Sequence, residues 1–237
     1  MTENSQPTRR CIALIPAAGV GARMAAGSPK QYLTIAGQPM LRHTADAFLA
    51  SALISHTYIV VSEGDGYIDS VVSPLEPGVT VLRCGGPTRM DSILNGLRAM
   101  RATVDDGDLV LVHDAARPGL TPGLIRKLID GAGDAEGGGL LALPVVDTVK
   151  STRGAALATV PRDGLWLAQT PQMFRYALLV RALSEAPDPH AITDDASAVE
   201  MLGYSPRLIE GHPRNLKVTL PTDIRIAEMY MAQPEQE

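Results

Sequence analysis

The chain has 237 residues, 45% of them hydrophobic and 20% charged, which is typical of a globular protein and excludes a fully disordered one. Its net charge of −5 and aromatic content of 4% argue against a nucleic-acid-binding protein. The two cysteines, Cys11 and Cys84, fit no metal-ligand or disulfide spacing and indicate a reducing compartment. Because we find neither a signal peptide nor an apolar run of about 18 residues, we expect a cytoplasmic protein without membrane contact.

Short apolar runs alternate with helical patterns through the first part of the chain. The expected strands cover residues 11–15, 57–61, 79–84, 108–113 and 139–146. The expected helices cover 39–50, 88–100 and a segment that begins with Thr121 as N-cap and Pro122. This alternation predicts βαβ units, and therefore an α/β protein with a Rossmann-like, mostly parallel twisted sheet and helices on both faces.

The pattern changes at about residues 147–170, where two imperfectly alternating segments flank Arg153 and Gly154. We expect a β-hairpin arm that projects from the sheet here. The rest of the chain predicts helices at 174–186 and 194–202, strands at 206–210 and 215–219, and a last helix from Pro221. We expect one domain over residues 8–233, with flexible tails at 1–7 and 234–237.

The loop at 16–31 follows the first strand, and ligands of parallel sheets bind beyond the carboxyl ends of strands. Its small residues allow backbone N–H groups to approach an anion closely. No Asp or Glu occurs between Asn4 and Ala45, whereas Arg9, Arg10, Arg23, Lys30 and Arg42 do. This local positive charge in an acidic protein predicts a polyphosphate site, with Arg23 and Lys30 as its mobile cations. The glycines alone would also fit a plain turn with solvated cations.

The spacing of this loop excludes two common phosphate-binding motifs. In a P-loop a Gly-Lys pair precedes Ser or Thr, but Lys30 follows Pro29. A dinucleotide fingerprint requires Gly or Ala where Met24 stands.

Seven motifs follow one another in order along nearly the whole chain. They are Pro16-Ala-Ala-Gly-x-Gly-x-Arg-Met with Pro29-Lys-Gln-Tyr, Gly85-Gly86-x-x-Arg89-x-x-Ser92, Leu111-Val-His-Asp-Ala-Ala-Arg-Pro118, Pro144-Val-x-Asp-Thr-x-Lys150, Arg162-x-Gly-Leu-Trp-x-x-Gln-Thr-Pro-Gln172, Thr193-Asp-x-Ala-Ser197 and Asn215-x-Lys-Val-Thr219. Together they resemble the nucleotidyltransferases and, more narrowly, the 2-C-methyl-D-erythritol 4-phosphate cytidylyltransferase family of the non-mevalonate isoprenoid pathway.

The resemblance implies transfer of CMP from CTP to 2-C-methyl-D-erythritol 4-phosphate, which releases pyrophosphate. The implied catalytic residues are Arg23, Lys30, Arg162 and Lys217. The implied nucleotide-binding residues are Pro16, Ala17, Ala18, Gly19, Gly21, Gly86, Ser92, Asp114 and Ala115. The implied substrate-binding residues are Arg117, Thr148, Arg162, Thr170, Thr193 and Lys217.

The resemblance also implies a Mg²⁺ ion that is carried by CTP and needs no metal site made by the protein alone. It implies a homodimer joined through the arm, in which Arg162 would serve the site of the other subunit. One position departs from the family pattern: relatives often carry a polar residue after the Gly-Gly pair, and this chain has Pro87. Without a backbone N–H, Pro87 leaves the base to be held by backbone groups and Ser92.

Other interpretations of the sequence stay open. The same motifs suit a cytidylyltransferase for another polyol phosphate, such as ribitol 5-phosphate. A nucleotide-binding oxidoreductase with a degenerate glycine loop and a non-catalytic nucleotide-sugar sensor are alternatives of another class. Asp114 and Arg117 could also form a surface ion pair at a strand end, and we expect His113 to be a packing residue rather than a base.

Overall fold

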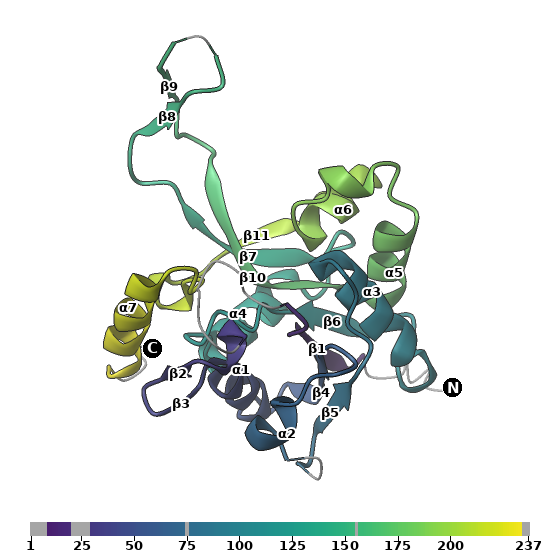
Figure 1. Cartoon of the computed structure of the whole chain (residues 1–237). Coiled ribbons are helices and arrows are strands. Elements are labelled where there is room, and N and C mark those ends of the chain that lie inside the picture. The colour runs from purple at the N-terminus through teal and green to yellow at the C-terminus, as the bar shows by residue number, and fades with distance from the viewer. Residues whose placement is uncertain (1–8, 20–28, 74–75, 155, 234–237) are drawn as a thin grey trace.

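A seven-stranded sheet with strand order β11-β7-β10-β6-β1-β4-β5 lies at the centre of the molecule (Figure 1). The computed structural model describes residues 9–19, 29–73, 76–154 and 156–233. The strands are β1 (Cys11–Pro16), β4 (Ile54–Val60), β5 (Val79–Leu82), β6 (Leu109–Val112), β7 (Gly139–Pro144), β10 (Trp166–Arg175) and β11 (Arg207–Glu210). All neighbouring pairs are parallel except the two that β10 makes with β6 and β7. The predicted mostly parallel α/β sheet is confirmed.

Helices cover both faces of this sheet because successive side chains of a strand point to opposite faces. In β1, Ala13 and Ile15 pack with α1 and α4, whereas Ile12 and Leu14 pack with α3, α5 and α6. The α-helices are α1 (Met40–Leu49), α2 (Ile68–Val71), α3 (Arg89–Ala99), α4 (Pro122–Ala132), α5 (Tyr176–Ser184), α6 (Asp195–Met201) and α7 (Pro221–Met231). Four 3-10 turns, at Lys30–Tyr32, Arg101–Thr103, Pro189–Ala191 and Pro213–Asn215, complete the helical segments described. None of the described helices has the length and apolarity needed to span a bilayer.

The prediction for residues 166–175 was wrong. This segment is one long central strand, β10, and the helix after it begins at Tyr176 rather than Phe174. The structure places Pro171 where the pairing of β10 with β7 shifts register, between Ala168 and Gln172. A residue without an N–H is tolerated at such an irregularity, so proline does not end the strand.

Two further details differ from the sequence predictions. The strand expected at 215–219 does not form, because Asn215 ends a 3-10 turn and the segment after it pairs with no strand. A short hairpin of β2 (Thr34–Ile35) and β3 (Gln38–Pro39) was not predicted. Its two turn residues, Ala36 and Gly37, have φ of 46° and 85°. This conformation matches the tight turns that connect antiparallel strands.

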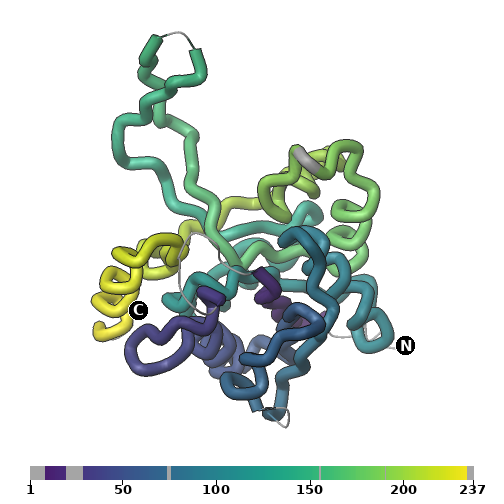
Figure 2. Tube along the Cα trace, viewed as in Figure 1, coloured from purple at the N-terminus to yellow at the C-terminus, as the bar shows by residue number. Residues whose placement is uncertain are grey.

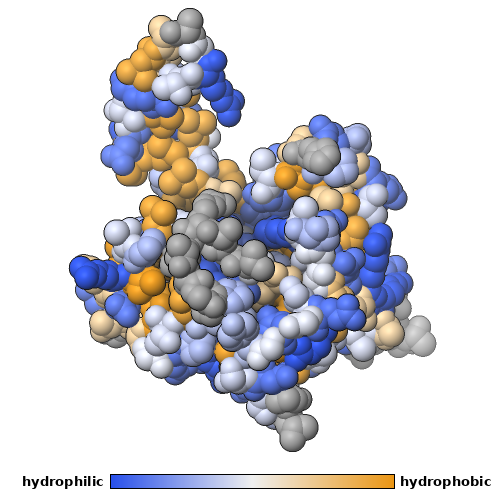
Figure 3. Space-filling view, viewed as in Figure 1, coloured by the Kyte–Doolittle hydropathy of each residue, from blue (hydrophilic) through white to orange (hydrophobic). Residues whose placement is uncertain are grey.

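The arm is a separate two-stranded sheet of β8 (Val149–Ser151) and β9 (Ala158–Val160), paired antiparallel as expected. It projects well away from the rest of the chain (Figures 1 and 2). The apolar side chains of Val146, Leu157 and Leu167 are 71%, 68% and 59% exposed. Hydrophobic residues accordingly cover much of the arm and its base (Figure 3). Isolated two-stranded sheets are marginally stable in water, so this surface lacks the cover that a core would provide.

Candidate active site

A cavity of about 420 Å³ lies at the edge of the sheet where β1 and β6 end. Residues that directly follow these two strands line it, together with the loop before α3. Such a place, beyond the carboxyl ends of parallel strands, is where open α/β sheets bind ligands. Ten of the residues singled out from the sequence line this cavity: Pro16, Ala17, Ala18, Gly19, Lys30, Gly86, Ser92, Asp114, Ala115 and Lys217.

The first wall is the start of the glycine-rich loop. The carbonyl oxygen of Ala17 accepts a hydrogen bond from Gln31 Nε2 at 2.7 Å, and that of Ala18 accepts one from Ser62 Oγ at 3.0 Å. Because both carbonyl oxygens are bound by protein donors, the loop does not present them to an anion. Two predicted residues of this loop, Gly21 and Arg23, lie outside the described residues.

The second wall is the Gly85-Gly86 loop. A Cβ atom on Gly85 would lie 2.3 Å from the Cβ of Ala18, so only glycine allows this loop to pack against the first one. Ser92 is 3% exposed, and its Oγ accepts from Gly86 N at 3.1 Å and donates to Thr88 O at 2.9 Å. Ser92 therefore fixes the shape of the loop, and its predicted contact with a nucleotide stays a prediction.

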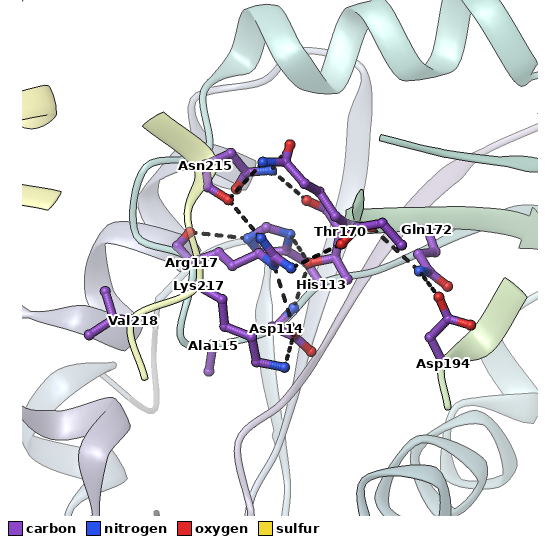
Figure 4. A network of polar contacts seen from close by, with 12 residues as sticks. His113, Asp114, Ala115, Arg117, Thr170, Gln172, Asp194, Asn215, Lys217 and Val218 are labelled. Carbon is purple, nitrogen blue, oxygen red and sulfur yellow. Dashed lines mark hydrogen bonds and ion pairs between the residues drawn. The ribbon is translucent and has the colours of Figure 1, made fainter. Parts of the chain in front are cut away.

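A charged cluster lies around Asp114, and Figure 4 shows Arg117 and Lys217 pointing toward this carboxylate. Asp114 accepts from Arg89 Nε at 2.8 Å, pairs with Lys217 Nζ at 2.8 Å, and lies 3.7 Å from Arg117 Nε. Burial alone would raise the pKa of Asp114, but Arg89, Lys217 and Arg117 hold that pKa well below its usual range. Asp114 is therefore ionised at neutral pH, and it holds Arg89 and Lys217 at the cavity.

Arg89 joins Asp114 to a second carboxylate that the sequence analysis missed. Its Nη1 and Nη2 atoms bind the two oxygens of Asp195 at 3.1 and 2.9 Å, a bidentate arrangement. Asp195 is 1% exposed, and burial raises its pKa although Arg89 opposes the shift. Arg89 stood in one of the quoted motifs without a role. The structure shows that it lines the cavity and links the carboxylates of Asp114 and Asp195.

A buried hydrogen-bond chain supports the cluster from behind. His113 is 0% exposed, and its Nε2 lies 3.2 Å from Arg117 O, which can only accept. With the proton on Nε2, Nδ1 accepts from Thr170 Oγ1 at 2.9 Å, and this Oγ1 in turn accepts from Asp114 N at 3.1 Å. His113 is thus a packing and orienting residue, as the sequence analysis expected.

Burial lowers the pKa of His113 to about 3, despite the nearby Asp114, so the folded protein keeps this ring neutral. The unfolded chain binds a proton there below about pH 6.5, so the free energy of unfolding should fall as the pH drops from about 6.5 to 3. The His113 contribution to this slope approaches about 1.4 kcal/mol per pH unit. Urea denaturation at several pH values should show a flatter profile for His113→Gln, with exposed His212→Gln as control. Equal slopes for wild type and His113→Gln would contradict the assignment.

The 3-10 turn Pro213–Asn215 is tied to the same cluster. Asn215 is 0% exposed, its carbonyl accepts from Arg117 Nη1 at 2.8 Å, and its Nδ2 donates to Thr170 O at 2.7 Å. These bonds place Lys217, two residues later, against Asp114. Arg117 and Thr170 are only 8% and 4% exposed, and Arg117 Nε has no hydrogen-bond partner in the described part of the chain. Their predicted contacts with a substrate phosphate stay predictions.

Three predicted residues lie apart from the cavity. Thr148 and Arg162 are exposed residues of the arm, and the guanidinium of Arg162 donates to Val146 O. Thr193 is exposed just before α6 and does not line the cavity. Within one chain, therefore, the cavity brings together the nucleotide-side residues but not Thr148, Arg162 and Thr193.

Comparison with known proteins identifies a family for this chain. The family model for 2-C-methyl-D-erythritol 4-phosphate cytidylyltransferase (IspD) matches residues 11–233. The chain belongs to this family. The cytidylyltransferase of Azoarcus sp. (strain BH72) is 50% identical over 227 residues, 94% of each chain. That of Ralstonia nicotianae is 50% identical over 250 residues, which cover 100% of this chain and 98% of its own.

Solved structures of this cytidylyltransferase family share the fold as well. One, titled 4-diphosphocytidyl-2C-methyl-D-erythritol synthase, is 42% identical with a TM-score of 0.83 and covers 95% of this chain and 100% of its own. The cytidylyltransferase from Thermus thermophilus is 34% identical with a TM-score of 0.76 and covers 94% and 100%. The family resemblance seen in the sequence motifs is confirmed.

Proposed function

We propose that this protein transfers CMP from CTP to 2-C-methyl-D-erythritol 4-phosphate, giving 4-diphosphocytidyl-2-C-methyl-D-erythritol and pyrophosphate, a step in isoprenoid precursor biosynthesis. The observation that carries the proposal is that ten residues chosen from the family motifs line one cavity at the sheet edge. The relatives named for this reaction span nearly the whole chain at 50% identity.

The chemistry suits the side chains of the cavity. The attacking group is a phosphate oxygen that is already anionic at neutral pH, so the reaction requires no general base. It requires positive charge where two anions meet and pyrophosphate leaves. Lys30 and Lys217 both line the cavity, and Lys30 Nζ donates to Val218 O at 3.2 Å, next to Lys217. Two lysines therefore belong to the lining of this cavity.

The cavity can accept a Mg²⁺ ion that arrives with the triphosphate. Asp114 is the one carboxylate among the described lining residues, and both of its oxygens contact cations. No group of three or more His, Cys, Asp or Glu side chains in the described ranges could hold a metal. Mg²⁺ commonly takes one or two carboxylates together with phosphate oxygens. Asp114 is therefore the residue that would hold it, and the ion would neutralise phosphate charge.

Without nucleotide, we expect Mg²⁺ to bind more weakly than about 1 μM, since one ion-paired carboxylate makes a poor site. Titration calorimetry of the ligand-free protein with MgCl₂ measures this directly. Asp114→Asn is the matched variant, and its nucleotide-free titration should look the same as that of wild type. Submicromolar binding to wild type that Asp114→Asn abolishes would show a strong protein site.

A comparison of substrates distinguishes the proposed function from that of a cytidylyltransferase for another polyol phosphate. Pyrophosphate release from CTP should be fast with 2-C-methyl-D-erythritol 4-phosphate and slow with ribitol 5-phosphate at equal concentration. Faster release with ribitol 5-phosphate would favour the alternative cytidylyltransferase. No release with either substrate would favour an oxidoreductase or a non-catalytic sensor, and NAD(H) binding would then separate these two.

The arm supports assembly as a homodimer. Val146, Leu157 and Leu167 are more than half exposed, and Leu165 and Trp166 are 38% and 39% exposed. Packing two copies of the arm around a two-fold axis would bury this apolar surface in both subunits. The same exchange would carry Arg162 and Thr148, which lie apart from the cavity of their own chain, to the substrate phosphate in the other subunit.

Arg162→Ala should raise the KM for the methylerythritol phosphate or lower kcat while CTP affinity stays nearly unchanged. A mixture with Lys30→Ala, after subunit exchange, should regain activity, because one site of each mixed dimer contains two intact halves. With random pairing at equal amounts, recovery should approach about a quarter of wild-type activity. Arg153→Ala, near the tip of the arm, is the control. A fully active monomer, or no recovery after proven exchange, would rule out shared sites.

A further inference from the structure

A second cavity, of about 800 Å³, lies between the start of α4, the 3-10 turn Pro213–Asn215 and the end of α7. It shares no lining residue with the first cavity. Arg126, Lys127, Arg214 and His212 line it, and no Asp or Glu occurs among its described lining residues. In a chain with a net charge of −5, this wall carries three formal positive charges and no negative one.

These three cations are not neutralised elsewhere in the described part of the chain. The side chains of Arg126, Lys127 and Arg214 take part in no hydrogen bond or ion pair there. The Nε atom of Arg214 is moreover buried without a partner. A buried donor left unsatisfied destabilises the protein, more so when it is charged. An acceptor bound in the cavity would relieve that cost, so the wall is arranged for a negatively charged ligand.

Among the other side chains of the wall, the ring of His212 is a donor. His212 Nδ1 accepts from Arg214 N at 3.0 Å, which places the proton of the neutral ring on Nε2 as a donor. The ring of Tyr230 contacts that of His212 edge-on, with centroids 6.1 Å apart. Thr121 caps α4, an 11-residue helix whose N-terminus favours anions. Three cations and a ring donor in one wall suit a ligand rich in acceptor oxygens, as a phosphate group is.

We propose that this cavity binds a small molecule carrying two phosphate groups. Each phosphate group carries about −1.5 to −2 charges at pH 7, so two of them match the three cations of the wall. The volume of about 800 Å³ exceeds that of the first cavity, which leaves room for both groups and a small organic part. Arg214 of the 3-10 turn lines this cavity, and Lys217, two residues after the turn, lines the first.

Glycine-selective ¹⁵N labelling of the full chain tests this site with inorganic pyrophosphate in Mg²⁺-free buffer. Gly123 and Gly211 report on the second cavity, and Gly19 and Gly86 report on the first, where the proposed reaction would also bind pyrophosphate. We expect saturable shifts at Gly123 and Gly211. Lys127→Ala and Arg214→Gln should each weaken this response about tenfold, because each removes a charge-assisted contact. Neither variant should change the response of Gly19 and Gly86.

Arg225→Gln is the matched control, because Arg225 is an exposed cation of α7 that does not line the cavity. It should leave the affinity at Gly123 and Gly211 within about twofold, since screened surface charge contributes little. An equal loss of pyrophosphate affinity in Arg225→Gln would overturn the proposal, because it would indicate a diffuse positive surface potential rather than a specific site. Shifts confined to Gly19 and Gly86 at pyrophosphate concentrations up to about 10 mM would overturn the proposal. If orthophosphate bound as tightly as pyrophosphate, the proposal that the ligand carries two phosphate groups would be overturned.

Discussion

Replacement of Lys30 by alanine is expected to lower kcat by about 10²-fold or more while the protein stays folded. Lys30 lines the cavity on a 3-10 turn directly after the glycine-rich loop, and its Nζ lies beside Val218. Loss of one preorganised positive charge removes transition-state stabilisation that water cannot replace in a partly closed site. Arg23→Ala carries the same prediction from the sequence, although Arg23 lies outside the described residues.

Steady-state pyrophosphate release measures this effect, and circular dichroism confirms that the variants are folded. Arg98→Ala is a suitable control, because it removes an exposed cation of α3 that does not line the cavity. Lys30→Arg, which keeps the charge, should retain more activity than Lys30→Ala. If Lys30→Ala had a kcat close to that of wild type, Lys30 would have no part in the chemistry.

Asp114→Asn should lower the free energy of unfolding by about 3 kcal/mol, because the buried Arg117 and the partly exposed Arg89 and Lys217 lose the carboxylate that they share. Asp114 is 8% exposed and contacts Arg89 and Lys217 at 2.8 Å, with Arg117 at 3.7 Å. Asparagine has the same shape, so the change isolates the charge. Activity should fall as well, since Lys217 would lose the group that aims it into the cavity.

Urea denaturation at several pH values separates this effect from a packing defect. The pKa of Asp114 is lowered in the folded state, so its stabilising contribution is present above the unfolded pKa of about 3.9 and is lost as the pH falls below it. Wild type and Asp114→Asn should therefore converge in acid. Asp105→Asn, whose side chain is 84% exposed, is the control and should change stability by at most about 0.5 kcal/mol. A pH-independent difference would contradict the electrostatic explanation.

Local patterns predicted most of the elements because each is set by neighbours in the chain. The apolar run at 11–15 and the Thr121-Pro122 start of α4 both lie where the sequence placed them. Of the described cations in the acid-free stretch, Lys30 lines the cavity, whereas Arg9, Arg10 and Arg42 form ion pairs elsewhere. β10 was missed because its place between β6 and β7 depends on partners far away in the sequence.

The residues of the site also fall into two groups, those that could be predicted from the sequence and those that could not. The loops that carry the cavity could be predicted, because strand ends and small residues can be located from local composition and periodicity. The bridge that Arg89 makes between Asp114 and Asp195, two carboxylates 81 positions apart in the chain, became visible in the folded structure alone. Only the structure showed that the hydroxyl of Thr170 serves His113 and Asp114, and that Arg126, Lys127 and Arg214 face a common cavity. The physical reason is that burial and ion pairing depend on distance in space, and packing of the sheet and its helices sets that distance.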